Sequence, residues 1–229
     1  MFRRIFYAAI FAGIAAGIIM SAVQYFRVTP YILAAETFEH APHDHGTAQA
    51  QSMPAAEPWK PDEGLERIAY TVLANLVISI AFALALLGAS LLLDLPITPA
   101  NGAFWGLCGF LVFSLAPSAG LPPELPGFPV AELWTRQLWW WFAVAMTASG
   151  LAIVAKHRAP GYLALAIMLI GLPHLIGAPN PPTYETSLPA HLASGFVANA
   201  IASAAVFWMV LGLILGFINE RAFRPRVLE

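Results

Sequence analysis

Six long apolar stretches dominate this sequence and constrain its fold more than any other feature. A helix needs about 20 apolar residues to cross the hydrocarbon core of a bilayer, and lipid offers the backbone no hydrogen-bond partners, so spanning segments must be helical. The sequence therefore predicts an all-α, polytopic helical membrane protein with about six transmembrane helices. Five is the alternative count, because the third and fifth stretches are short. The stretches cover residues 5–24, 68–93, 102–117, 138–155, 162–178 and 192–218.

The composition excludes several other classes of protein. Only 10% of the 229 residues are charged, whereas soluble domains carry about 25% charged residues, so a soluble enzyme is excluded. A net charge of -2 without a basic stripe argues against nucleic-acid binding. The single cysteine, Cys108, allows no intrachain disulfide. The sequence has no phosphate-binding loop, nucleophile elbow or zinc-protease motif, so we expect neither enzyme activity nor a tightly bound cofactor.

The polar segment between the first two stretches sets the expected organisation of the chain. Residues 27–67 are rich in proline and alanine and hold three of the six histidines. We expect a first transmembrane helix over 1–26, a periplasmic histidine-containing loop over 27–67, a helical membrane bundle over 68–220 and a cytoplasmic tail over 221–229. Within the loop, residues 29–38 are expected to continue the first helix beyond a kink at Pro30.

The basic residues predict how the chain is oriented. With six spans both termini lie on one side, and that side collects seven lysine and arginine residues against four on the other. Because cytoplasmic loops carry the excess of basic residues, both termini are expected in the cytoplasm. The seven are Arg3, Arg4, Lys156, Arg158, Arg221, Arg224 and Arg226, and the four are Arg27, Lys60, Arg67 and Arg136.

Three pairs of glycines lie four residues apart within the apolar stretches. Such pairs let helix backbones approach each other closely, although a glycine-rich membrane chain also contains them by chance. The pairs are Gly13 with Gly17, Gly102 with Gly106, and Gly212 with Gly216.

The densest group of metal-binding residue types lies in the polar loop, where H-A-P-H-D-H follows two glutamates. Imidazole and carboxylate groups together suit borderline divalent cations such as cobalt, nickel, zinc and copper. If residues 36–40 are helical, the two glutamates and the first histidine share one face. We therefore predict a cation-capture site, and the alternative is a solvated loop with incidental histidines. The predicted ligands are Glu36, Glu39, His40, His43, Asp44 and His45.

A second set of polar residues lies in the outer half of the predicted bundle. His174 is a candidate metal ligand because an ionisable group at membrane depth marks function; the alternative is a hydrogen bond to a backbone carbonyl that the preceding proline leaves free. Asn75 and Asn199 either pass a cation onward or lock helices together by hydrogen bonds, and we favour the second role. Gln24 and His191 lie at the outer edges of the same region.

Six segments carry a resemblance to a known family. They are M-F-R-R-I-F-Y-A-A-I-F-A-G-I-A-A-G-I at the start, V-Q-Y-F-R-V-T-P-Y-I-L-A-A-E from Val23, G-L-E-R from Gly64, L-A-P-S-A-G-L-P-P-E-L-P-G from Leu115, R-Q-L-W-W from Arg136 and L-P-H-L-I-G-A-P from Leu172. Together they resemble the CbtA family of predicted bacterial cobalt transporter subunits. The likeness covers nearly the whole chain and keeps the family's order.

The resemblance implies cobalt import across the bacterial cytoplasmic (inner) membrane for cobalamin synthesis, with cobalt or another divalent cation as the substrate. It also implies a small one-span partner of the CbtB type, which carries a histidine-rich end. Carried over to this chain, the family motifs contain Glu124, Arg136, Gln137 and His174. The family is usually described with five spans, against six in this sequence.

Two hypotheses of different classes remain open at this point. The first is a subunit of a cobalt-uptake transporter that captures cations at the outer loop. The second is a structural or accessory subunit of a larger membrane complex that transports nothing itself. The glycine pairs favour the second hypothesis, and so does the scarcity of polar groups in the inner half, since a complete transporter needs ligands on both halves. The inner half offers only Ser90, Asp94, Thr147, Ser149 and Asn219.

Overall fold

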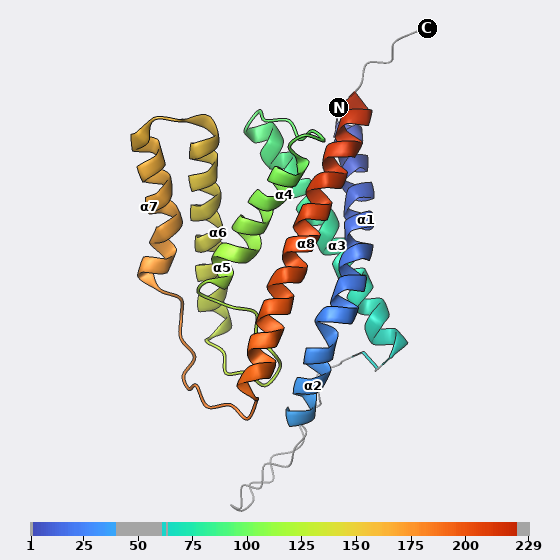
Figure 1. Cartoon of the computed structure of the whole chain (residues 1–229), viewed down its shortest axis with the longest axis vertical. Helices are drawn as coiled ribbons and strands as arrows, with labels where there is room; N and C mark the ends of the chain where they lie inside the picture. The colour runs from blue at the N-terminus through green and yellow to red at the C-terminus, as the bar shows by residue number, and fades with distance from the viewer. Residues whose placement is uncertain (1, 40–60, 63, 224–229) are drawn as a thin grey trace, which may run out of the picture.

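A computed structural model of the chain describes residues 2–39, 61, 62 and 64–223 (Figure 1). All regular structure in these residues is helical, which confirms the predicted all-α class. The elements are α1 (Phe2–Arg27), α2 (Thr29–Glu39), α3 (Leu65–Leu92), α4 (Gly102–Phe110), the π-helix η1 (Leu111–Leu115), α5 (Ala116–Ser118), α6 (Leu133–Lys156), α7 (Pro160–Ile176) and α8 (Ala190–Phe223). The helix expected to follow the kink at Pro30 is present as α2.

Four helices are long and apolar enough to cross a membrane: α1, α3, α6 and α8. The other two predicted spans are shorter apolar helices, Gly102–Ser118 and Pro160–Ile176. The 17 residues of α7 rise about 25 Å as a helix, which is less than the hydrocarbon thickness of about 30 Å. The structure thus gives four full-length spans, and the expected count of six is not established.

The helices run side by side between two ends of the molecule (Figure 1). At one end α1 begins and α8 finishes, and we call it the termini face. At the other end lie α2 and the start of α8, with the start of α3 close by, and we call it the loop face; α7 ends short of it. The two faces carry different polar groups, so each is described separately below.

The helices form a main bundle with an attached hairpin. In the bundle α1 packs against both α3 and α8, and α4 packs on the other side of α8. In the hairpin α6 packs against α7, and α6 joins the bundle through η1 and α5. The bundle core is centred on buried side chains of α8, including Trp208, Leu211 and Leu215.

The glycine pairs lie at the closest helix crossings. A Cβ atom on Gly13 would lie 2.6 Å from the Ile80 Cα of α3, and one on Gly102 would lie 2.5 Å from the carbonyl oxygen of Gly212 in α8. Both distances are shorter than real Cβ contacts, so only glycine permits these approaches. All three pairs are therefore used within this chain, which removes one of the two arguments for the accessory role.

Candidate functional site

The predicted cation-capture site lies only partly within the described residues. Glu36 is in α2 and Glu39 is its last residue, whereas His40, His43, Asp44 and His45 fall outside the described part of the chain. Among the residues that the structure does describe, no group of three histidine, cysteine, aspartate or glutamate side chains is placed to hold a metal ion. The geometry of the capture site therefore stays a prediction.

The structure does show how the two ends of the polar loop are held. The Arg67 guanidinium of α3 donates to both carboxylate oxygens of Glu36 in α2, at 2.5 Å and 3.0 Å. Both side chains are about one-third exposed or less. A bidentate arginine–carboxylate pair fixes orientation as well as distance, so the ends of the segment between these residues are fastened together. A cation would have to displace the guanidinium before it could bind Glu36.

Asn75 of α3 connects its helix to α1. Its amide nitrogen donates to the side-chain oxygen of Gln24 at 2.7 Å and to the hydroxyl of Ser21 at 3.1 Å. These two bonds use both amide hydrogens. Gln24, expected at the outer edge of the bundle, is thus part of the same contact between α1 and α3. The geometry supports the helix-locking role that the sequence favours.

Asn199 of α8 makes a separate contact. Its amide nitrogen donates to the hydroxyl of Tyr31 in α2 at 3.2 Å and to the carbonyl oxygen of Gly195 at 2.8 Å. Asn199 therefore fastens α2 to α8, whereas Asn75 fastens α3 to α1. Neither amide nitrogen donates to the other asparagine or to His174.

Replacing Asn75 by leucine tests the locking role. We expect the variant to be less stable by about 1 kcal/mol, because interhelical hydrogen bonds in membrane proteins contribute about 0.6–1.7 kcal/mol. Thermal unfolding of the purified protein in detergent measures the effect. The matched control is Asn180→Leu in an exposed connection, which should unfold as the unaltered protein does. Unchanged unfolding together with lost cobalt uptake in Asn75→Leu would assign Asn75 to the cation path instead.

His174 lies in the last turn of α7, and its side chain is exposed on the surface of the chain. Its ring meets the edge of the buried Trp139 ring of α6, with centroids 5.9 Å apart. The Trp139 indole nitrogen donates to the carbonyl oxygen of Pro173 at 3.3 Å. Trp139 thus fixes the end of α7, beside which His174 is exposed. His191 is likewise exposed, at the start of α8.

A pocket of about 470 Å³ opens near the loop face between α6, α8 and the segment that carries L-P-P-E. An ion pair lies in its wall, where Arg136 Nη2 of α6 donates to Glu124 Oε2 at 2.5 Å. Glu124 is 19% exposed and Arg136 is 28% exposed, and the Nε of Arg136 is buried without an acceptor in the described part of the chain. Gln137 lines the same pocket.

This ion pair limits what the loop-face pocket can bind. A guanidinium fixed beside the carboxylate neutralises it and repels a second cation, in the way that an arginine bars cations from some channels. The pair joins L-P-P-E-L-P-G to R-Q-L-W-W, two of the segments that carry the family resemblance. We conclude that Glu124 and Arg136 anchor the connection to α6. The pair is not expected to bind a divalent cation, because the arginine already neutralises the carboxylate.

Two further features of this pocket were not expected from the sequence. Ser114 and Ser118 line it, and Ser114 accepts a hydrogen bond from the Trp208 indole at 3.0 Å. Ser114 belongs to η1, where Phe113 stacks on Trp208 with centroids 5.5 Å apart. Short π-helices often occur at functional sites, but no sequence rule places one here.

The connection into α6 has its own electrostatic anchor. Glu132 caps this helix and accepts hydrogen bonds from the backbone N–H groups of Trp134 and Thr135, each at 2.9 Å. These donors stabilise the charged form and hold the pKa of the Glu132 carboxyl below its usual range. The capping fixes where α6 begins, and so places Arg136 one turn later.

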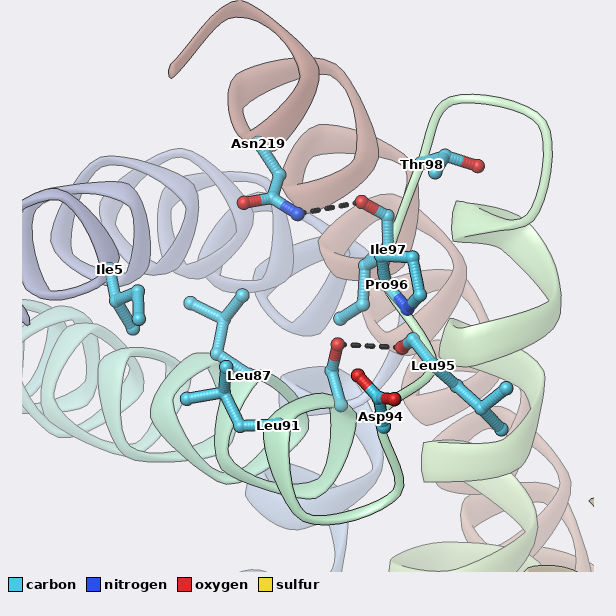
Figure 2. Close-up of a pocket in the computed structure, with 10 residues that line it drawn as sticks. Ile5, Leu87, Leu91, Asp94, Leu95, Pro96, Ile97, Thr98 and Asn219 are labelled. Atoms are coloured by element: carbon cyan, nitrogen blue, oxygen red, sulfur yellow. Dashed lines mark hydrogen bonds between the residues drawn. The ribbon is translucent and has the colours of Figure 1, made fainter. Parts of the chain in front are cut away.

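A second pocket, of about 320 Å³, lies at the termini face (Figure 2). It brings together three of the five polar residues that the sequence assigns to the inner half: Ser90, Asp94 and Asn219. They come from the end of α3, the connection to α4 and the end of α8. Nothing in the sequence indicates that these residues converge, because 125 positions separate Asp94 from Asn219.

Together, these helices and paired polar groups define a helical membrane protein with one polar pocket near each end of its bundle. Comparison with known proteins agrees, because the sequence model of the CbtA family, described as a probable cobalt transporter subunit, matches residues 2–220. The chain belongs to the CbtA family. No curated protein and no solved structure matches it. Membership supports a membrane protein concerned with cobalt transport, and the family's description as a transporter component implies at least one partner.

Proposed function

We propose that this chain is the membrane-embedded subunit of a cobalt-uptake transporter in the bacterial inner membrane. The family match over residues 2–220 carries the proposal, because it covers every described helix almost completely. In this proposal the termini face is cytoplasmic, as the excess of basic residues there indicates. The loop face then meets the periplasm, from which the cation is taken. Cobalt is cargo, and the chain is not an enzyme.

We further propose that the cation is captured by His40, His43, Asp44 and His45, with Glu39 beside them. The observation in favour is the ion pair between Glu36 and Arg67, which fastens the loop at the loop face. Glu39, the last described residue before these histidines, ends α2 at this face. His174 is exposed in the last turn of α7 and offers the next imidazole along the proposed path. The partner is a small one-span, histidine-rich protein of the CbtB type.

Cobalt accumulation in cells that express the chain with its partner tests the proposal. Replacing His40, His43 and His45 together by alanine should lower uptake at limiting cobalt by about 10-fold to 100-fold. Losses of metal affinity of this size follow even when only the hydrogen-bond partners of metal ligands are replaced. His174→Ala should lower it as well. His157→Ala is the control, because this ring stacks on Tyr162 at the termini face. Full uptake in both test variants would refute the capture route.

The accessory role remains the second candidate function, and one observation favours it. Within the described ranges, Asn75, Asn199, Glu36 and Glu124 all have their polar groups engaged in contacts between segments. A chain built this way suits a scaffold in a larger membrane complex. Purification from native membranes distinguishes the roles, because stoichiometric recovery with a large complex and no dependence of cobalt uptake on this chain would establish the scaffold.

A further inference from the structure

The pocket at the termini face has polar atoms along one wall and apolar side chains along the other. Figure 2 shows Asn219 of α8 hydrogen-bonded to Ile97, and Asp94 beside Leu95 further along the same α3–α4 connection, with Leu87 and Leu91 of α3 on the apolar side. Ile5 of α1 completes the lining on the apolar side. The pocket therefore depends on three helices of the main bundle, and its polar wall is assembled only in the folded chain.

Asp94 occupies a backbone position that normally favours glycine. Its φ is +51°, and α3 ends there in a Schellman motif: Asp94 N–H donates to the carbonyl oxygen of Leu91 at 3.2 Å, and Leu95 N–H to that of Ser90 at 3.0 Å. A side chain in this conformation costs stability relative to glycine. A carboxylate beside a helix C-terminus also faces the negative end of the helix dipole. Asp94 is thus unfavourable for folding in two ways.

The charge around this carboxylate differs from that at the loop face. Glu36 and Glu124 are each paired with an arginine. In contrast, none of the ten residues that line this pocket is lysine or arginine, and no described side chain forms a hydrogen bond or ion pair with the Asp94 carboxylate. The C-terminal carbonyls of α3 add negative potential at the same place. Among the residues that line the pocket, the formal charge is therefore negative.

Side chains hold two backbone carbonyl oxygens here in place, whereas the Asp94 side chain is exposed. The Ser90 hydroxyl donates to the Leu95 carbonyl oxygen at 2.7 Å, and the Asn219 amide nitrogen donates to that of Ile97 at 2.7 Å. Each carbonyl keeps a second lone pair, and the amide oxygen of Asn219 remains an acceptor. Carboxylate, amide and carbonyl oxygens are the ligands that hard or hydrated cations prefer. Unwound backbone near a helix C-terminus coordinates cations in other transporters.

We propose that this pocket binds a partly hydrated divalent cation through Asp94, assisted by Asn219 and the Leu95 and Ile97 carbonyls. A cation with six waters occupies about 180 Å³ at about 30 Å³ per water, and the pocket holds about 320 Å³. Binding itself rests on the pocket alone. The role we assign to it, release of cobalt at the cytoplasmic face, rests on the proposed function. Oxygen ligands hold cobalt more weakly than imidazoles do, which suits a site of release.

The test is Mn²⁺ binding to the purified full chain in a non-ionic maltoside detergent, followed by the electron paramagnetic resonance signal of free Mn²⁺. His40, His43 and His45 are replaced by alanine throughout, so that the loop does not contribute. Asp94→Gly removes the carboxylate and suits the positive φ, so it should keep or raise the unfolding temperature while weakening Mn²⁺ binding by about 10-fold to 100-fold. Asp94→Asn should also weaken it. Glu185→Gln, an exposed acid in another connection, should bind as the parent does.

Mn²⁺ binding of parental strength in both Asp94 variants would overturn the proposal. A second outcome would also overturn it: Mn²⁺ does not bind, and phosphatidylethanolamine raises the unfolding temperature of the parent but not of the Asp94 variants. The pocket would then bind a lipid ammonium group. Cobalt uptake separates this inference from the proposed function. Asp94-dependent Mn²⁺ binding without uptake by the native chain and its partner would refute the function alone, whereas uptake without such binding would refute the pocket alone.

Discussion

Replacing Gly212 by alanine is expected to destabilise the protein by about 3 kcal/mol, the upper range for overpacking a tight interior. A Cβ atom there would lie 2.6 Å from the backbone nitrogen of Gly106 and 2.8 Å from its Cα. The clash is with backbone on the facing helix, so no rotamer change relieves it and α4 must move away from α8. Gly212→Leu should prevent recovery of folded protein altogether. Thermal unfolding in detergent, with size-exclusion chromatography for aggregation, measures both effects.

Gly88→Ala in α3 is the matched control. It is also a helical glycine, but an added Cβ atom would have no heavy atom within 4 Å. Alanine stabilises a helix by about 0.5–1 kcal/mol relative to glycine, so this variant should unfold at the same or a higher temperature. The two glycine-to-alanine changes are thus expected to have opposite signs. Equal unfolding temperatures for Gly212→Ala and Gly88→Ala would show that the crossing of α4 and α8 is looser than the structure indicates.

The sequence predicted the helices well because the bilayer leaves the backbone few choices. The apolar run over 68–93 became α3 (Leu65–Leu92), and the run over 192–218 became α8 (Ala190–Phe223). Helix existence follows from local composition alone, since each backbone group in lipid must be satisfied within its own segment. The short runs are the exception: α7 and the α4–α5 segment are helical, but their length does not decide whether they cross.

Pairing between segments was much harder to predict. The sequence identified Gly102 and Gly212 as sites of close approach but not as each other's partners. Likewise, the sequence counts Arg67 and Arg136 among the charges that orient the chain, and places Arg136 in a family motif, but it does not indicate that they pair with Glu36 and Glu124. Spacing within a helix is fixed by its 3.6-residue period, but contacts between helices depend on tertiary packing that a single sequence does not specify.

The same limit applies to the candidate sites. Asp94 and Asn219 are isolated rim residues in the sequence, and only the folded bundle places both in one pocket. The positive φ of Asp94 could not be predicted from the sequence either, because glycine is the residue that usually indicates that backbone conformation. By contrast, the histidine and acid pattern of the loop is visible only in the sequence, since most of it lies outside the described residues.

The second large effect is expected at the ion pair between Glu124 and Arg136. Arg136→Met should destabilise the protein by about 2 kcal/mol, because it leaves a carboxylate that is only 19% exposed without its counter-charge. Breaking a fully buried ion pair costs about 3–5 kcal/mol. The partial exposure of this pair reduces that cost. The double variant Glu124→Gln with Arg136→Met should recover at least half of the loss, since no unpaired charge remains. Both are measured by thermal unfolding in detergent.

Two comparisons make this second prediction decisive. Arg158→Met, at an exposed arginine of the α6–α7 connection, should leave the unfolding temperature unchanged and so controls for loss of a positive charge in general. The double variant then separates two roles of the pair. If the pair only anchors the connection to α6, cobalt uptake should return together with stability. If stability returns and uptake does not, the charges themselves act on the cation, and our conclusion that the loop-face pocket excludes it would have to be abandoned.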